Sequence, residues 1–213
     1  MELVVFVGIP ASGKSTESEK YRAKGYRIIS SDEIRGGIMK GVSLAEISKE
    51  EQDRVNAIVF DTLYEEVENA LSLGESVVVD ATHLNRKIRT DFLKRYKKFP
   101  CVKKCVMFIT PFGTCLQRNR KRSGPALVPD DIMKWMLSVY ECPWYSEGWD
   151  IIEPVISKEV YGPISAEVKD FPPGTAEYRN CKAYLSLTEK CYRPDFTPAE
   201  FPDILHQVRF EAE

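Results

Sequence analysis

Residues 7–16 have the sequence Val-Gly-Ile-Pro-Ala-Ser-Gly-Lys-Ser-Thr and follow an apolar run, residues 3–7, that is typical of a buried parallel strand. From Gly8 to Ser15 the stretch fits the phosphate-loop pattern G-x-x-x-x-G-K-[ST] without a gap. Glycines let backbone N–H groups turn toward an anion, and a helix that begins here points its positive end at the same anion. The stretch therefore predicts a loop that holds nucleotide phosphates.

Within this loop, Lys14 supplies a charge for the β- and γ-phosphates, and the Ser15 hydroxyl is a ligand for Mg²⁺. A glycine-rich turn with a solvated Lys14 is the alternative that the pattern leaves open. The predicted nucleotide-binding residues are Gly8, Ser12, Gly13, Lys14, Ser15 and Thr16.

Size and composition set limits on what the chain does. Its 213 residues are enough for one domain of about 150 residues and an extension. A formal net charge of −2 argues against a protein that coats nucleic acid. Six cysteines without a C-x-x-C pair and two histidines disfavour a zinc cluster and favour free thiols in a reducing compartment. With no leader and no apolar run of ~20 residues, we expect a cytoplasmic protein without a membrane span.

Strand and helix patterns alternate along the first three quarters of the chain. This alternation predicts an α/β fold with a mainly parallel sheet, helices on both faces and a site at the C-terminal ends of the strands. Pro154 should confine the last strand to an edge or end it early. The predicted strands are 3–7, 26–30, 76–80, 104–109 and 151–156, and the predicted helices are 14–24, 31–39, 48–73, 86–99 and two that begin at 111 and 129.

A helical lid is predicted at about residues 118–130. Arg118 and Arg122 are four residues apart, so we expect them to share a helix face and to reach a transferring phosphoryl group together. A Gly-Pro break follows at residues 124–125 before a second helix begins. A solvated basic face is the plainer alternative. The predicted catalytic domain is 1–156, and the proline-rich residues 157–213 form an irregular extension of unknown role.

Two residues just past the second strand are candidates for the acceptor half of a phosphoryl-transfer site. Asp32 is the candidate general base for an attacking hydroxyl, and Arg35, one helical turn later on the same face, is the candidate partner of an acceptor phosphate. The alternative is that Asp32 only favours the helix dipole and Arg35 is solvated.

The end of the third predicted strand carries a further set of polar residues. Asp80 is either a Mg²⁺ ligand of the Walker-B type or a contact to the acceptor, and the sequence does not separate the two. Thr82 and Asn85 are candidate acceptor contacts, with a turn former and a helix cap as the alternatives. His83 reads better as a satisfied loop histidine than as a catalyst.

Taken in order, these motifs resemble the kinase module of phage and bacterial 5′-polynucleotide kinases over about residues 3–155. The resemblance implies a P-loop kinase fold, ATP and Mg²⁺, and transfer of the γ-phosphate to the 5′-OH end of DNA or RNA. It implies Lys14, Asp32 and Arg122 as catalytic residues, Arg118 and Arg122 as lid contacts to ATP, and Ser15 and Asp32 as metal ligands. It implies acceptor contacts from Arg35, Asp80, Thr82 and Asn85. The matching segments are 8–16, 30–35, 79–85 and 118–122.

The resemblance stops short of a complete match. The Asp-x-Asp motif of the phage enzymes' phosphatase partner is absent from the sequence. Related P-loop kinases act on small metabolites, nucleosides or aminoacyl-tRNA, so the donor is more firmly predicted than the acceptor. A nucleotide-binding switch or scaffold is the alternative of another class.

Overall fold

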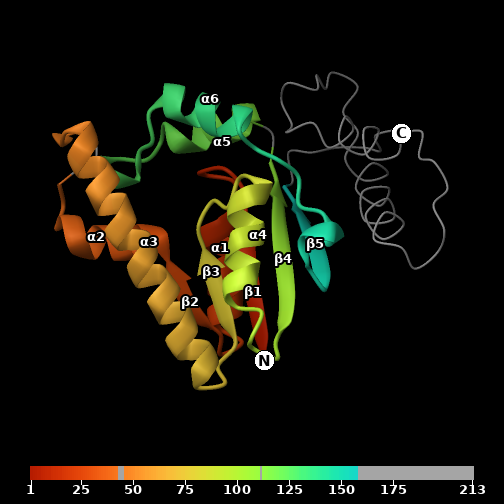
Figure 1. The fold of residues 1–213 in the computed structure, drawn as a ribbon. Helices are drawn as coiled ribbons and strands as arrows, with labels where there is room; N and C mark the ends of the chain where they lie inside the picture. The colour runs from red at the N-terminus through yellow and green to blue at the C-terminus, as the bar shows by residue number, and fades with distance from the viewer. Residues whose placement is uncertain (43–45, 111, 158–213) are drawn as a thin grey trace, which may run out of the picture.

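The computed structural model describes residues 1–42, 46–110 and 112–157. Strands and helices alternate along this part of the chain, as the sequence predicts (Figure 1). The elements are β1 Glu2–Val7, α1 Lys14–Arg22, β2 Arg27–Ser30, α2 Ser31–Met39, α3 Lys49–Ser72, β3 Val77–Asp80, α4 Arg86–Arg95, β4 Val102–Ile109, α5 Phe112–Asn119, the 3₁₀ turn η2 Gly124–Ala126, α6 Asp130–Ser138, the 3₁₀ turn η3 Tyr145–Glu147 and β5 Ile151–Ile156.

The five strands form one parallel sheet in the order β2-β3-β1-β4-β5. The predicted α/β fold with a parallel sheet is confirmed. The strand that precedes the phosphate loop, β1, is central, and β5 lies at an edge, where Pro154 pairs in register with Met107. An edge strand tolerates proline because no further strand needs its missing N–H donor.

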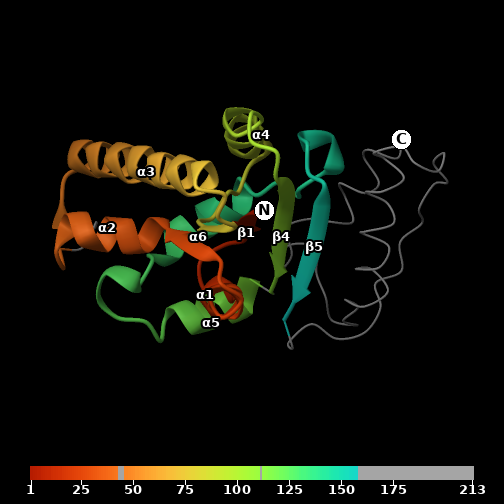
Figure 2. The same cartoon turned by 90° about the horizontal axis from the view of Figure 1, so that it is seen from below.

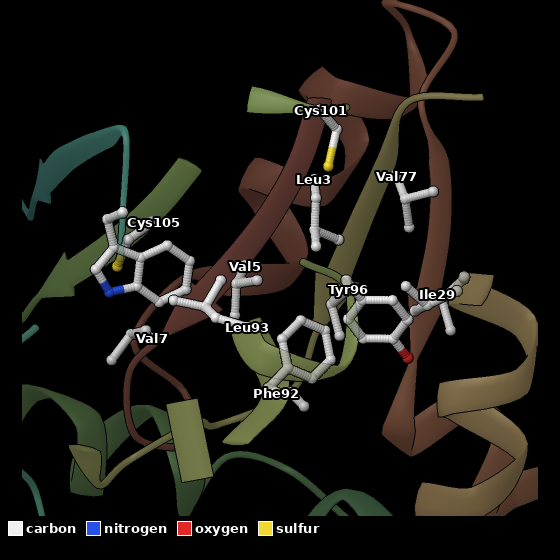
Figure 3. Close-up of a cluster of buried hydrophobic side chains, with 14 of the residues drawn as sticks. Leu3, Val5, Val7, Ile29, Val77, Phe92, Leu93, Tyr96, Cys101 and Cys105 are labelled. Atoms are coloured by element: carbon white, nitrogen blue, oxygen red, sulfur yellow. The ribbon is translucent and has the colours of Figure 1, made fainter. Parts of the chain in front are cut away.

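Both faces of the sheet are covered, which explains the continuous apolar run of β1. Leu3 and Val5 point toward α3 and α4 and belong to the larger core cluster, part of which is drawn in Figure 3. Val4 and Phe6 point to the opposite face, where Tyr21 of α1 packs on them. Alternate side chains of a strand face opposite sides, so a strand buried on both faces is apolar at every position.

The helix boundaries mostly follow the predicted signals, but two helices, α4 and α5, end earlier than predicted. Ser30 caps α2, and Ser48 forms a complete capping box with Glu51 at the start of α3. Helix α4, however, ends at Arg95 and not at Phe99. The ring of Tyr96 is buried and its hydroxyl donates to the carbonyl of Tyr64 at 2.9 Å, so tertiary contacts end the helix before the predicted stop.

Helices α5 and α6 lie across the end of the sheet opposite the N-terminus (Figure 1). They pack on the site loops through Cys115 and Met133, which share a cluster with Ile9 and Leu84. The predicted lid region, residues 118–130, holds only the end of α5, the 3₁₀ turn η2 and the first residue of α6, so the two helices flank it. Closure over a substrate stays a prediction. The predicted extension, residues 157–213, lies outside the described residues except for Ser157.

The structure also bears on two expectations from composition, free thiols and the lack of a membrane span. The four cysteines of the described residues, Cys101, Cys105, Cys115 and Cys142, are buried and are not joined in disulfides. Within residues 1–42, 46–110 and 112–157, no helix combines the length and apolar character needed to cross a membrane.

Candidate active site

The phosphate loop lies between β1 and α1 and has a backbone that its glycines make possible. A Cβ atom on Gly8 would lie 2.8 Å from Ser12 Oγ and 2.9 Å from Phe108 Cβ, so the loop closes against β4 only with glycine at this position. Gly13 has a φ of 109° and Ala11 a φ of 63°, both in the left-handed region. Such a backbone turns successive N–H groups toward one point, the geometry that cradles phosphates.

The Lys14 ammonium folds back over this loop. Its Nζ donates to the carbonyl oxygens of Gly8 and Ile9, each at 2.9 Å. Burial lowers the pKa of Lys14, and the carboxylates of Asp80 and, more weakly, Asp32 oppose that shift. The Asp80 carboxylate is therefore the acidic group that acts most strongly on Lys14.

Asp80 is fixed by the helix that follows the phosphate loop. Its Oδ2 accepts a hydrogen bond from Ser18 Oγ at 2.8 Å. Burial raises the pKa of Asp80, against the opposing effects of Lys14 and Ser18. Ser15, one turn before Ser18 on α1, is exposed. A hydroxyl and a carboxylate on neighbouring elements are oxygen ligands of the kind that Mg²⁺ prefers when nucleotide phosphates complete its shell.

Protein ligands alone do not form a metal site in this part of the chain. Among the described residues, no group of three or more histidine, cysteine, aspartate or glutamate side chains could hold a metal ion. A Mg²⁺ ion that is bound mainly through phosphates needs only one or two carboxylates from the protein, and Ser15, Asp32 and Asp80 fit that donor set.

Asp32 lies at the same end of the sheet as Asp80, because Ser30 at the end of β2 pairs in register with Asp80 at the end of β3. The Asp32 side chain is 88% exposed, and its Oδ1 accepts a hydrogen bond from Arg35 Nη1 at 2.9 Å. Nη2 of Arg35 donates to Asn56 Oδ1 of α3 at 3.3 Å. The predicted shared face of Asp32 and Arg35 is thus present, and the carboxylate is open to solvent.

The loop after β3 contains residues with mainly structural contacts. The carbonyl of Thr82 accepts from the backbone N–H of Gly8 at 3.2 Å and so ties this loop to the phosphate loop. Asn85 caps α4 by accepting from the backbone N–H of Ile88 at 2.9 Å. His83 is buried with Nδ1 3.1 Å from the carbonyl oxygen of Phe6, and burial lowers its pKa to about 4. The satisfied loop histidine that the sequence suggested fits this environment.

The two arginines predicted for the lid, Arg118 and Arg122, differ in how they lie relative to the phosphate loop. Arg118 lies on α5 and donates from Nη1 to the carbonyl of Ala11 at 3.5 Å. The expectation that Arg122 shares its helix face is wrong, because α5 ends at Asn119. Arg122 still lies close enough to Lys14 for its charge to lower the pKa of that lysine.

Helix α5 ends early at Asn119, whose side chain binds the backbone of the loop that follows. The fully buried side chain of Asn119 donates to the Val128 carbonyl at 2.6 Å and accepts from the Val128 backbone N–H at 3.1 Å. This pair of hydrogen bonds closes residues 119–128 into a loop, and Arg122 lies within it. The run of charged residues at 118–122 does not predict these hydrogen bonds or the loop that they close.

A buried ion pair behind the site holds the loop after β3, and the sequence patterns gave no sign of it. Nε and Nη2 of Arg89 donate to the two carboxylate oxygens of Glu147, each at 2.7 Å. Nη1 donates to the carbonyls of His83 and Leu84, and Nη2 also donates to that of Cys142. All five guanidinium donors are therefore used by the protein, which marks Arg89 as structural.

Ser18, Asn56 and Thr110 are further residues around the site that sequence reasoning missed. Thr110, just past β4, donates from Oγ1 to the carbonyl of Ser12 at 2.9 Å and braces the phosphate loop. Only Ser18 had a usable signal, since it lies one helical turn after Ser15 on the predicted helix. Together the site combines a phosphate cradle, an open carboxylate and several cations, which are the parts that phosphoryl transfer requires.

Comparison with solved structures identifies this arrangement as a P-loop kinase fold. A putative kinase from Chloroflexus aurantiacus superposes with a TM-score of 0.60 at 18% identity, over 73% of this chain and 84% of that one. A sugar kinase from Janibacter gives 0.51 at 17% identity, over 74% and 84%. The Pnkp1/Rnl/Hen1 RNA repair complex gives 0.52 at 23% identity, over 65% of this chain and 43% of that chain.

These structures share the fold with the present chain, and their different names do not assign it an acceptor. The AAA domain family matches residues 3–143, which is more than half of the sequence. The matched region contains the phosphate loop, Asp32, Asp80 and the helices α5 and α6. The chain therefore belongs to the AAA domain family.

Proposed function

We propose that this protein is an ATP-dependent polynucleotide 5′-hydroxyl kinase. The observation that carries the proposal is the Asp32–Arg35 pair beside the phosphate loop. An exposed carboxylate lies 2.9 Å from a cation whose Nε has no hydrogen-bond partner in the described part of the chain. Such a pair suits an acceptor whose reacting hydroxyl has a phosphate nearby. The 5′ end of a DNA or RNA strand has this chemistry, because its 5′-OH and its first phosphodiester belong to the same nucleotide.

In the proposed reaction, the phosphate loop and Lys14 hold the β- and γ-phosphates of ATP. The acceptor 5′-oxygen forms a bond to the γ-phosphorus while the bond from that phosphorus to the β–γ bridging oxygen breaks, and ADP leaves. Asp32 accepts the proton of the hydroxyl. Arg35 binds the neighbouring phosphate of the acceptor, and Arg118 and Arg122 stabilise negative charge on the transferring group.

Mg²⁺ would be held by Ser15 with Asp80 or Asp32, and it would neutralise charge on the β- and γ-phosphates. We favour Asp80 for this role because its carboxylate is bound to Ser18 on the helix of the phosphate loop and acts more strongly on Lys14 than Asp32 does. This choice leaves Asp32 free to serve as the base. Thr82 and Asn85 then act mainly by shaping the loop next to the acceptor.

The test is a transfer assay with γ-labelled ATP, Mg²⁺ and a panel of acceptors. We expect label on DNA or RNA oligonucleotides that end in 5′-OH and none on the same strands with a 5′-phosphate. Transfer only to a sugar, a nucleoside or aminoacyl-tRNA would replace the proposed acceptor and keep the kinase. ATP binding without transfer to any hydroxyl would favour a nucleotide-binding switch.

A further inference from the structure

Arg35 differs from Arg89 in how much of its guanidinium the protein uses. Two of the five N–H donors of Arg35 bind protein acceptors, Asp32 Oδ1 at 2.9 Å and Asn56 Oδ1 at 3.3 Å. Its Nε is buried and has no hydrogen-bond partner among the described residues. All donors of Arg89 are used by the protein. Arg35 therefore keeps donors for a ligand.

The two partners of Arg35 differ in exposure and packing. Asp32 is 88% exposed, and an exposed ion pair three residues apart on one helix contributes little energy and little orientation. Asn56 lies on α3, which packs beside α2 (Figure 2) and is anchored one turn later by the fully buried Val59. Asn56 is therefore the partner of Arg35 whose position is held by packing between helices.

The chemical type of this contact also matters. An amide oxygen accepts a hydrogen bond without neutralising the cation, whereas a carboxylate at position 56 would pair with Arg35 and compete with an anionic ligand. The Arg35 side chain is 20% exposed, so part of the cation faces solvent while the rest is held between helices. Asn56 thus orients a partly buried charge and leaves that charge available.

We propose that Asn56 is a positioning residue that determines how tightly the site holds an acceptor with a phosphate next to its hydroxyl. This inference rests on the proposed function and adds α3 to the acceptor half of the site. Asn56 acts through Arg35 and does not itself touch the reacting atoms. A residue that only ties α3 to α2 would affect every substrate equally, whereas a positioning residue affects the phosphate contact alone.

The experiment compares two acceptors that differ in one charge. The first is a fluorescent oligonucleotide with a 5′-OH end, and the second is the same strand with its first internucleotide phosphate replaced by an uncharged methylphosphonate. Dissociation constants are measured by anisotropy without ATP, and kcat and KM are measured with ATP and Mg²⁺. The variants are Asn56→Ala and Asn56→Asp, and the matched control is Arg54→Ala, which removes a 71% exposed side chain from the same helix.

For Asn56→Ala, the loss of one hydrogen bond to Arg35 should weaken binding of the phosphodiester acceptor by about three- to tenfold. Binding of the methylphosphonate acceptor and the KM for ATP should stay unchanged. Asn56→Asp should weaken the phosphodiester acceptor further, because the new carboxylate pairs with Arg35 and repels the phosphate. Arg54→Ala should match the wild type with both acceptors.

Equal losses with both acceptors, or a rise in the KM for ATP, would overturn the inference. Equal affinity of the wild type for both acceptors would overturn it as well, since the site would then not read the phosphate. The proposed function fails separately: if the wild type prefers the phosphodiester strand and Asn56→Ala loses that preference, but no phosphate is transferred, the kinase is refuted and the positioning role is supported. The binding measurement keeps these two failures apart.

Discussion

Replacing Glu147 by glutamine removes the charge that balances Arg89 while keeping the shape of the side chain. The two side chains are 1% and 0% exposed, so water cannot replace the lost partner. Breaking a buried ion pair from one side typically costs about 3–5 kcal/mol. Because the amide of glutamine can still accept one hydrogen bond from Arg89, we expect a loss near the lower end, about 3 kcal/mol in the free energy of unfolding.

Urea unfolding at pH 7 measures this loss, with tryptophan fluorescence as the signal. Trp149 Nε1 donates to Glu147 Oε2 at 3.0 Å, so one fluorophore reports directly on the pair. For a protein of this size, about 3 kcal/mol corresponds to a fall in Tm of roughly 6–12 °C. The matched control is Glu50→Gln, whose partner Arg54 is 71% exposed, and its cost should stay below about 1 kcal/mol.

A loss for Glu147→Gln no larger than that of the control would refute the reasoning. The double variant Arg89→Met with Glu147→Leu adds a second check, because replacing both members of a buried pair by apolar side chains is often close to neutral. It should be more stable than Glu147→Gln. A double variant that is less stable than the single one would mean that the hydrogen bonds to the loop carbonyls, and not the ion pair, hold this region.

Three further substitutions test the site and its support. Asp32→Asn should lower kcat by about 10²- to 10⁴-fold and leave the Kd for ATP within about threefold, as measured by calorimetry; normal turnover would remove the base from the account. Arg122→Ala should lower kcat at least about tenfold with little change in the KM for ATP. The control Arg120→Ala loses only an exposed ion pair with Asp130 and should leave kcat unchanged. An effect of Arg122→Ala confined to KM would mean that Arg122 only steers the substrate. The pKa of His83 is about 4 in the folded protein, below the ordinary value of 6.5, so the unfolded chain binds this proton first and stability falls as the pH drops from about 6.5 to about 4. His83→Asn, which tolerates the φ of 44°, should flatten that part of a stability-against-pH curve, and an unchanged slope would assign it to other groups.

Much of the fold follows from local signals in the sequence. The apolar run of β1 was recognisable as a doubly buried strand because every position in it is apolar. Ser30 and Ser48 mark the starts of α2 and α3 through side-chain caps that involve residues only three positions away. Pro154 gives the edge position of β5, because a missing N–H donor excludes a central strand.

The features that could not be predicted depend on contacts between distant residues. Arg89 and Glu147 are 58 positions apart, and Arg35 and Asn56 are 21 positions apart on separate helices. The early end of α4 has the same origin, since the Tyr96 hydroxyl binds the carbonyl of Tyr64. The early end of α5 is different, because Asn119 binds Val128 only nine positions further along the chain. Helical spacing predicts Arg122 on α5, whereas Arg122 lies in the loop that the hydrogen bonds between Asn119 and Val128 close.

The donor half of the site was better predicted than the acceptor half for a related reason. A phosphate loop is a continuous stretch whose residue spacing encodes its geometry, so Gly8, Lys14 and Ser15 could be assigned from the sequence. The acceptor half is assembled from Asp32 and Arg35 of α2 and Asn56 of α3, which meet only in the folded chain. Its identification as a site for a strand end stays a prediction.

The most direct measurement is the mass of a 5′-OH oligonucleotide after incubation with the protein, ATP and Mg²⁺. We predict the gain of one phosphoryl group at the 5′ end, no gain for a strand that already has a 5′-phosphate, and no gain with Asp32→Asn. An unchanged mass with the wild-type protein, under conditions in which it binds ATP, would contradict the account.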